Sequence, residues 1–318
     1  MRHTLLAAAL VLVAGLAARP AAQRQAISLW VTLGDSDQLV EVDPWSFREL
    51  RRIRTDPKVH GLAASSDGSR LYVTSDKTGN FQVIDAVSGR ITGQLALGTD
   101  PNQMAMTRDG RFAFVPMRGE DAVAVVEIDP LRLVKKIPMN KGPHDAYTSP
   151  DGSRIYVGAQ YGNAIAVFDP LQQTLLHQIP TSAGVRPMAP TRDGRNVYVA
   201  LSNLIGFGVA DTVAQKVTRL AQLATKPDGL PQPYADTFTH ALQLMNNDTE
   251  LWVTDCVHDL VRVVRTKDLK EVAQIQVGHF PHWFAVRPDL QVVFVSLWFS
   301  DAVALIDIGG RKVLTNVQ

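Results

Sequence analysis

The chain has 318 residues, of which 46% are hydrophobic and 20% are charged, and its formal net charge is +1. This length and composition suit a folded protein with a large core and exclude a disordered or fibrous chain. The nearly neutral charge offers no positive surface for nucleic acid or for an anionic membrane, so we expect neither as a partner.

The first segment of the chain predicts export. Residues 1–22 contain a short basic start, an apolar run of about 14 residues and several small residues, which is the pattern of a secretory signal peptide. The run is too short for a typical transmembrane helix, so we expect no membrane span after cleavage; an uncleaved anchor is the alternative. Ala17, Ala18 and Ala22 are all suitable cleavage sites. The predicted location is the periplasm or the extracellular medium.

A repeat occupies the rest of the chain, residues 25–318. Its units align on a short turn such as SPDGSRIYV, and successive turns lie 42 residues apart, except for one interval of 54. The anchor residues of the seven units are Gln25, Asp67, Asp109, Asp151, Asp193, Asn247 and Asp289. Five positions after each anchor stands an aromatic residue, always followed by valine: Trp30, Tyr72, Phe114, Tyr156, Tyr198, Trp252 and Phe294. We interpret these aromatic residues as core.

Each unit contains four short β runs. In the fourth unit they cover residues 146–149, 154–159, 165–170 and 174–180, and an Asp-Gly pair predicts the hairpin turn between the first two. Units of four strands at a period of about 40 residues predict an all-β fold, a seven-bladed β-propeller of four-stranded antiparallel blades. In the first unit the inner strand is uncertain: either residues 19–25 supply it, or blade one is incomplete.

Short polar residues recur in the next turn of most units, between the second and third runs. They are Asp37, Asp121, Asn163, Asp259 and Asp301. Such side chains bond to the nearby backbone and tolerate tight turn geometry.

The repeat resembles the YVTN family of β-propeller repeats, which occur in exported bacterial and archaeal proteins. The stretch PHDAYTSPDGSRIYV, followed by NAIAVFDP, has the form of the family repeat, and RLYVTS (residues 70–75) and ELWVTD (250–255) come closest to its signature. The resemblance covers residues 25–318 and implies the propeller fold. It implies no single function, because similar propellers occur in binding modules, surface-layer proteins, lactonase-like enzymes, haem d1 domains and copper enzymes such as nitrous oxide reductase.

A column of polar residues, mostly histidines, stands seven positions before each anchor from the second unit onward. Its members are His60, Asn102, His144, Arg186, His240 and His282. The column marks the start of each innermost strand, so the symmetry of a propeller predicts a ring of six side chains around the mouth of the central channel. We expect His258 and His279 on the same face.

The ring has three interpretations. The first is a metal site for copper, iron or zinc, whose candidate ligands are His60, His144, His240 and His282. The second is a site for a polar small molecule or an anion, to which Asn102 and Arg186 would donate hydrogen bonds. The third is structural, with each histidine capping an inner strand and bonding to the backbone of the next blade.

Other residues on the predicted top face are further candidates. The long interval places an insertion near residues 223–238, which is either a lid whose Tyr234 and Asp236 face a ligand or a neutral surface loop. Tyr161, Trp298 and Phe299 are candidates for an aromatic wall around a ligand, with blade packing as the alternative. For Trp283 we favour blade packing.

Cys256 is the only cysteine, so the chain forms no intrachain disulfide. It lies two positions before His258, which makes a Cys-His nucleophile or a thiolate ligand conceivable. A lone cysteine in a hairpin turn is more often inert, and that is our prediction for Cys256.

The sequence therefore predicts an exported, monomeric binding or scaffold protein with a histidine-lined site at the top of its channel. The expected partner is a small-molecule or protein ligand at the channel mouth. The alternative is a metal-dependent propeller enzyme, or a lactonase-like or lyase-like enzyme, that uses the same ring. A subunit of a redox complex is a third hypothesis. The residues identify no catalytic group and no particular ligand.

Overall fold

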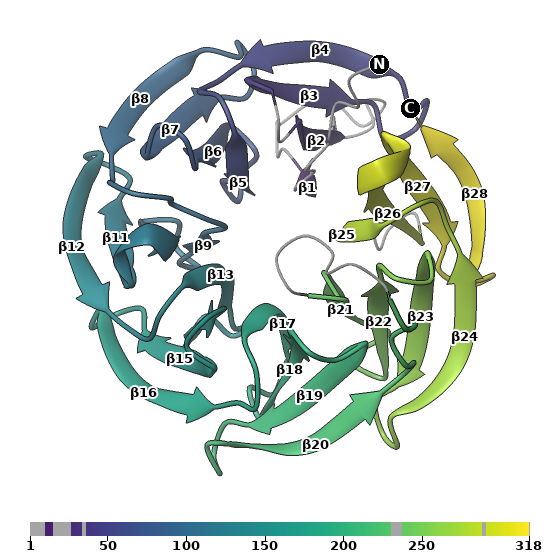
Figure 1. Ribbon diagram of the computed structural model, residues 1–318. Helices are drawn as coiled ribbons and strands as arrows, with labels where there is room; N and C mark the ends of the chain where they lie inside the picture. Colours follow the sequence, from purple (N-terminus) through teal and green to yellow (C-terminus); the bar gives the residue numbers. More distant parts are fainter. Residues whose placement is uncertain (1–9, 15–26, 34–35, 230–236, 288–290, 318) are drawn as a thin grey trace.

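The computed structural model describes residues 10–14, 27–33, 36–229, 237–287 and 291–317. Seven four-stranded antiparallel sheets stand around a central axis (Figure 1), and each is built from four consecutive strands. The protein is therefore a seven-bladed β-propeller, as the repeat predicts. Seven residues singled out in the sequence lie outside the described ranges: Ala17, Ala18, Ala22, Gln25, Tyr234, Asp236 and Asp289.

The strands of the first four blades follow, from the axis outward. Blade one contains β1 (Leu10–Ala14), β2 (Ile27–Leu33), β3 (Gln38–Val42) and β4 (Glu49–Arg54). Blade two contains β5 (Val59–Ala64), β6 (Arg70–Ser75), β7 (Asn80–Asp85) and β8 (Ile91–Ala96). Blade three contains β9 (Ala105–Met106), β10 (Phe112–Met117), β11 (Ala122–Glu127) and β12 (Arg132–Pro138). Blade four contains β13 (Pro143–Thr148), β14 (Ile155–Ala159), β15 (Ala164–Asp169) and β16 (Thr174–Pro180).

The remaining three blades repeat this order. Blade five contains β17 (Val185–Pro190), β18 (Asn196–Leu201), β19 (Gly206–Asp211) and β20 (Lys216–Gln222). Blade six contains β21 (Leu242–Met245), β22 (Glu250–Asp255), β23 (Leu260–Arg265) and β24 (Lys270–Gln276). Blade seven contains β25 (Pro281–Arg287), β26 (Val292–Leu297), β27 (Ala302–Asp307) and β28 (Lys312–Val317). Two 3₁₀ turns, η1 (Arg118–Glu120) and η4 (Trp298–Ser300), join the second and third strands of blades three and seven.

The column of aromatic residues forms the core, as predicted. All seven members are buried, with exposed fractions of 3% or less: Trp30, Tyr72, Phe114, Tyr156, Tyr198, Trp252 and Phe294. Their strands are apolar on both faces because each blade packs against a neighbour on either side. Phe294 of blade seven packs with Leu29 and Val31 of blade one, which closes the ring.

The turns also follow the sequence. In the Asp-Gly turn of blade four, Gly152 has φ +75°, and the Asp151 carboxylate accepts a hydrogen bond of 3.0 Å from the Ser153 backbone. The predicted polar residues of the next turn adopt left-handed φ values between 48° and 59° in four units, at Asp121, Asn163, Asp259 and Asp301. Only glycine and short polar residues adopt this conformation at low cost.

Blade one is completed by a strand that the sequence analysis did not anticipate. β1 pairs with β2, with Leu10 opposite Val31 and Ala14 opposite Ile27, and it lies between β5 and β25 around the axis (Figure 1). The inner strand thus comes from residues 10–14, within the predicted signal peptide, instead of residues 19–25. Removal of residues 1–22 stays a prediction, and it would leave the inner edge of β2 unpaired. No helix among the described residues is long and apolar enough to cross a membrane.

The inner strands of four blades begin with a β-bulge. In blade four, Pro143 pairs with Ala159 and Ala146 with Val157, so two residues of β13 face a single residue of β14. The bulged pairs in blades two, four, five and seven are His60–Gly61, His144–Asp145, Arg186–Pro187 and His282–Trp283. A bulge re-aims side chains out of the regular in-and-out alternation of a strand. Each of these bulges holds a member of the polar column.

Candidate ligand-binding site at the channel mouth

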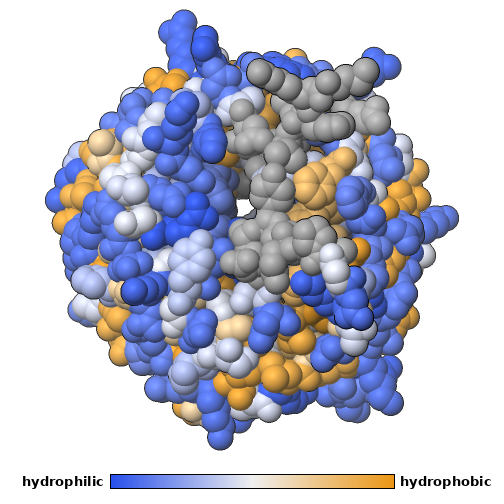
Figure 2. Space-filling view, in the orientation of Figure 1, coloured by the Kyte–Doolittle hydropathy of each residue, from blue (hydrophilic) through white to orange (hydrophobic). Residues whose placement is uncertain are grey.

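The polar column forms a ring at the mouth of the channel. Figure 2 shows the face on which it lies, with an opening at its centre and hydrophilic residues along the side of blades two to four. The rings of His60 in blade two and His144 in blade four are 5.1 Å apart, edge to face, although a whole blade intervenes in the sequence. The side chains therefore converge on the axis, as the symmetry argument predicts.

Hydroxyl groups of the second strands hold the backbone of the column in place. Thr74 accepts a hydrogen bond from the Gly61 N–H at 2.9 Å, Thr254 accepts one from Ala241 at 2.8 Å, and Ser296 accepts one from Trp283 at 3.0 Å. Each of these N–H groups belongs to the residue after a column histidine. In blades two and seven a bulge removes these groups from the regular ladder, and in blade six Ala241 precedes β21, so a side-chain acceptor satisfies each N–H and fixes the backbone beside the histidine.

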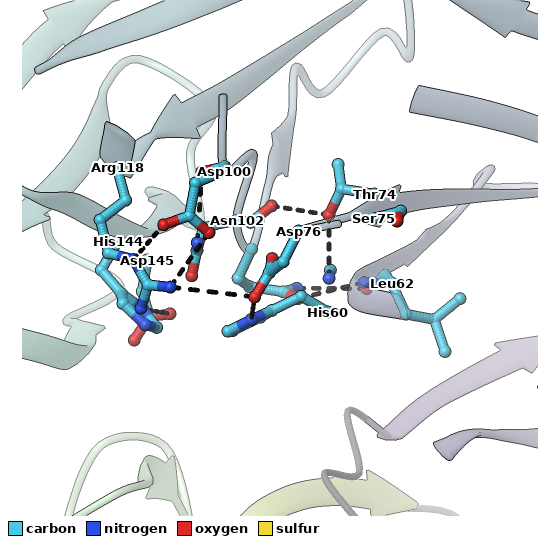
Figure 3. A network of polar contacts seen from close by, with 12 residues as sticks. His60, Leu62, Thr74, Ser75, Asp76, Asp100, Asn102, Arg118, His144 and Asp145 are labelled. Carbon is cyan, nitrogen blue, oxygen red and sulfur yellow. Dashed lines mark hydrogen bonds and ion pairs between the residues drawn. The ribbon is translucent and has the colours of Figure 1, made fainter. Parts of the chain in front are cut away.

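One side of the mouth is a charged network, shown in Figure 3. Asp76 accepts a hydrogen bond from Nδ1 of His60 at 2.9 Å, and Arg118 lies 3.9 Å from the same carboxylate. Arg118 also donates two hydrogen bonds to Asp100, at 2.7 and 3.0 Å. Burial works against the charge of Arg118, but the bonds to Asp100 outweigh it, so the pKa of the guanidinium is raised. The charge of Arg118 is thus balanced within the protein.

A buried chain of three residues crosses from blade four to blade five. Nδ1 of His144 lies 2.8 Å from Asp145 Oδ1, and Nη2 of Arg186 lies 2.7 Å from Nε2 of His144. Because arginine only donates, Nε2 of His144 must accept, and the single ring proton is on Nδ1. Burial, and then the positive charge of Arg186, lowers the pKa of His144 well below its usual value, so the ring is neutral. Both ring nitrogens of His144 are therefore engaged.

Arg186 is a buried cation without a matching anion. It is 4% exposed, and within the described ranges it makes no ion pair; its other contact is a 3.5 Å approach of Nη1 to Thr237. Burial lowers the pKa of Arg186, and the attraction of Asp145 offsets this only in part. Arg262 is a contrasting case in blade six, equally buried but paired with Asp255 at 2.8 Å and with Glu271 at 2.7 Å.

The other side of the mouth is aromatic. The rings of His240 and His282 stack, with centroids 3.5 Å apart, and Trp298 lies 4.5 Å from His282. Burial lowers the pKa of both histidines well below its usual value. For His240 the next causes are His282 and Arg186, and for His282 the next cause is the positive charge of Arg186. These two rings are neutral and present an aromatic surface next to Arg186.

Several buried polar atoms around the mouth have no protein partner in the described structure. They are Asn102 Oδ1, Asp145 Oδ2, Arg186 Nε, His240 Nδ1 and His282 Nδ1. Buried polar atoms are almost always paired with protein, water or ligand. Such a cluster at the end of a channel is therefore the arrangement expected of a site that receives a polar ligand with its water.

The comparisons with known proteins agree with the fold. A model of the YNCE-like beta-propeller family matches residues 48–232, more than half of the chain. The chain belongs to this family. A search of curated proteins found no match.

Among solved structures, this YNCE-like propeller is similar to three proteins of low sequence identity. Hydrazine synthase of Kuenenia stuttgartiensis is 16% identical, with a TM-score of 0.76 over 88% of this chain and 92% of that one. A protein of unknown function from Desulfotomaculum acetoxidans is 14% identical, with a TM-score of 0.75 over 91% and 94%. Dihydro-heme d1 dehydrogenase NirN, in complex with DHE, is 14% identical, with a TM-score of 0.70 over 99% and 69%. At these identities the similarity shows the fold alone.

The structure separates the four candidate metal ligands into two groups. His60 and His144 each bond a carboxylate on blades two and four, whereas His240 and His282 lie face to face. In the part of the chain that the structure describes, no three His, Cys, Asp or Glu side chains form a group that could hold a metal ion. Metal binding at these residues stays a prediction.

The remaining candidates take different places. Trp298 joins the aromatic side, as one interpretation proposed, and the exposed ring of Tyr161 covers Gly142 at the rim of the same face. Trp283 packs with the blade-seven and blade-one core. Cys256 is buried, and its thiol donates to the Pro281 carbonyl oxygen at 3.0 Å, which agrees with an inert role. Tyr234 lies outside the described residues.

Sequence reasoning missed the charged residues behind the ring, chiefly Asp76, Arg118 and Asp145. A signal for two of them exists, because a second column stands nine positions after the anchors. Its members are Asp76, Arg118, Gln160, Ser202, Cys256 and Trp298. These positions begin the turn between the second and third strands, on the same face as the histidine column. Asp145 follows His144 directly and enters the site only because of the bulge in β13.

Proposed function

We propose that this YNCE-like propeller is an exported binding protein that takes a small organic anion at the mouth of its channel, with Arg186 as the main anion-binding residue. The observation that carries the proposal is the buried guanidinium of Arg186, which makes no ion pair among the described residues. Removing a cation from water costs several kcal/mol, roughly, unless a partner compensates it. A ligand carboxylate would supply that partner.

The surroundings of Arg186 suit a carboxylate. Its Nε is buried without a partner, and a guanidinium binds a carboxylate through two parallel N–H groups. The Nδ1 atoms of the neutral His240 and His282 can donate a further hydrogen bond each. Across the mouth, Asn102 Oδ1 and Asp145 Oδ2 are buried acceptors that a hydroxyl group of the ligand would satisfy.

Export to the periplasm or the medium is part of the proposal and is supported by the pattern of residues 1–22. We further propose that the protein acts as a monomer. The residues of the candidate site all come from one chain, so no second copy is needed to complete it.

Thermal unfolding tests the anion site directly. The protein would be titrated with sodium acetate and sodium succinate, with sodium chloride at matched ionic strength as the reference. We expect the carboxylates to raise the unfolding temperature, since ligands that bind only the folded state stabilise it. Arg186→Gln should abolish this rise, whereas Arg219→Gln, an exposed arginine on β20 of the same blade, should keep it. An equal rise in the wild type and in Arg186→Gln would refute the proposal.

Elemental analysis separates the proposal from the metal-dependent alternative. The protein, purified without a polyhistidine tag, would be compared with a His144→Ala/His240→Ala double variant. Near-stoichiometric copper, iron or zinc that disappears in the variant would replace the anion proposal by a metal site. The anion proposal expects no such metal.

A further inference from the structure

The aromatic side of the mouth is more extensive than the histidine pair alone. Trp298 lies 4.5 Å from His282, and Phe280 packs on both His282, at 6.1 Å, and Phe299, at 5.0 Å. His282, Trp298 and Phe299 are only partly buried, and the exposed fraction of Phe299 is 40%. Figure 2 shows hydrophobic residues to the right of the central opening, opposite the hydrophilic side. We call His240, His282, Trp298, Phe280 and Phe299 the aromatic wall.

The aromatic wall adjoins the anion-binding residue. Arg186, His240 and His282 belong to blades five, six and seven, which are consecutive around the axis (Figure 1). The charge of Arg186 lowers the pKa values of both His240 and His282, as expected of groups that share one poorly solvated space. If the anionic group of a ligand binds Arg186 and the rest of the ligand points toward blade seven, that remaining part lies along the aromatic wall.

The opposite side of the mouth offers no comparable apolar surface. Blades two to four present the network of His60, Asp76, Arg118 and Asp100, in which the Arg118 guanidinium lies between the carboxylates of Asp76 and Asp100. An apolar group placed there would remove these charges from water without replacing their solvation. Among the described residues, the side of blades six and seven is therefore the better surface for a flat apolar body.

From this asymmetry we propose that the ligand is an aromatic carboxylate, with its carboxylate on Arg186 and its ring against the aromatic wall at His282 and Trp298. The inference rests on the proposed anion-binding function and adds the chemical class of the ligand. Aromatic rings gain from offset or edge-to-face contacts beyond the burial of their area. The neutral rings of His240 and His282 can make such contacts with the ligand ring, whereas a charged imidazolium would have to stay solvated.

Calorimetric titration with three probes tests the inference: 2-naphthoate, which has both groups; acetate, which has only the carboxylate; and 2-naphthylmethanol, which has only the ring. We expect 2-naphthoate to bind at least about tenfold more tightly than either of the others. Trp298→Leu should weaken 2-naphthoate about fivefold to tenfold and leave acetate unchanged, and Trp298→Phe should restore most of the loss. Trp45→Leu, in the turn between β3 and β4, is the matched control and should change neither affinity.

The variants distinguish the two proposals. Arg186→Gln should weaken both acetate and 2-naphthoate, and its failure to do so refutes the anion-binding function. If 2-naphthoate binds the wild type no more tightly than acetate, or if Trp298→Leu weakens both probes equally, the aromatic class is wrong while the anion site stands. Circular dichroism of each variant confirms that the propeller is folded.

Discussion

Two buried arginines of this propeller, Arg186 and Arg262, predict opposite responses to the same substitution. Arg186 and Arg262 are each 4% exposed, but only Arg262 has carboxylate partners, Asp255 and Glu271. Replacing each with methionine keeps most of the side-chain volume and removes the charge. The comparison therefore measures whether each charge is compensated inside the protein.

For Arg262→Met we expect a loss of about 3–5 kcal/mol in the free energy of unfolding, which is typical when one partner of a buried ion pair is removed. Asp255 is 0% exposed, so its carboxylate would remain buried. For Arg186→Met, the lost bond leaves Nε2 of His144 without a donor, at a cost of about 1–3 kcal/mol. The substitution also removes the cost of burying an unpaired cation, which is roughly several kcal/mol. We therefore expect the free energy of unfolding to stay the same or to rise by up to about 2 kcal/mol.

Urea unfolding of the ligand-free proteins at neutral pH measures both changes. A loss of more than about 3 kcal/mol in Arg186→Met would refute the reasoning, because it would mean that the protein itself, through Asp145, already compensates the charge of Arg186. The anion proposal would then lose its physical basis.

Four further predictions follow from the structure. His144, His240 and His282 have lowered pKa values in the folded protein. Below pH about 6.5 the unfolded chain therefore binds more protons than the folded one, and the free energy of unfolding falls by about 1.4 kcal/mol per pH unit for each histidine. Urea midpoints at pH 7.5 and 5.5 should show this fall, with a smaller difference in His240→Asn, and equal midpoints would contradict it. Burial raises the pKa of Cys256, so its thiol should react with a thiol-specific reagent only after unfolding, and rapid reaction of the native protein would show otherwise. A Cβ on Gly158 would lie 2.8 Å from Val185 and push against the start of β17, whereas one on Gly309, in the turn between β27 and β28, meets nothing within 4 Å. Gly158→Ala should therefore weaken the response to acetate, and Gly309→Ala should leave it unchanged. Mass spectrometry of the exported protein should find a mature N-terminus near residue 23, and an intact Met1 in the exported fraction would show that β1 is retained.

The repeat determines most of this fold by itself. The period of 42 residues, the aromatic-valine column and the Asp-Gly turns specify four strands per unit and seven units, because strand alternation and turn chemistry act over a few residues. The repeat also determines where the histidine column lies, because equivalent residues of the units occupy equivalent places around the axis. Strand ends were less certain: β13 begins at Pro143 instead of Ala146, and this difference brings His144 and Asp145 into the strand.

Only the tertiary structure decided how the members of the ring pair. The sequence presents His60, His144, His240 and His282 as equivalent, yet His144 bonds to Arg186 from the next blade while His240 stacks on His282. Asp145 became part of the site through a bulge that no local pattern announces, whereas Asp76 belongs to a second column nine positions after the anchors. The physical reason is that a repeat fixes where each side chain starts, whereas contacts across the axis depend on side-chain length, charge and burial in all seven blades together.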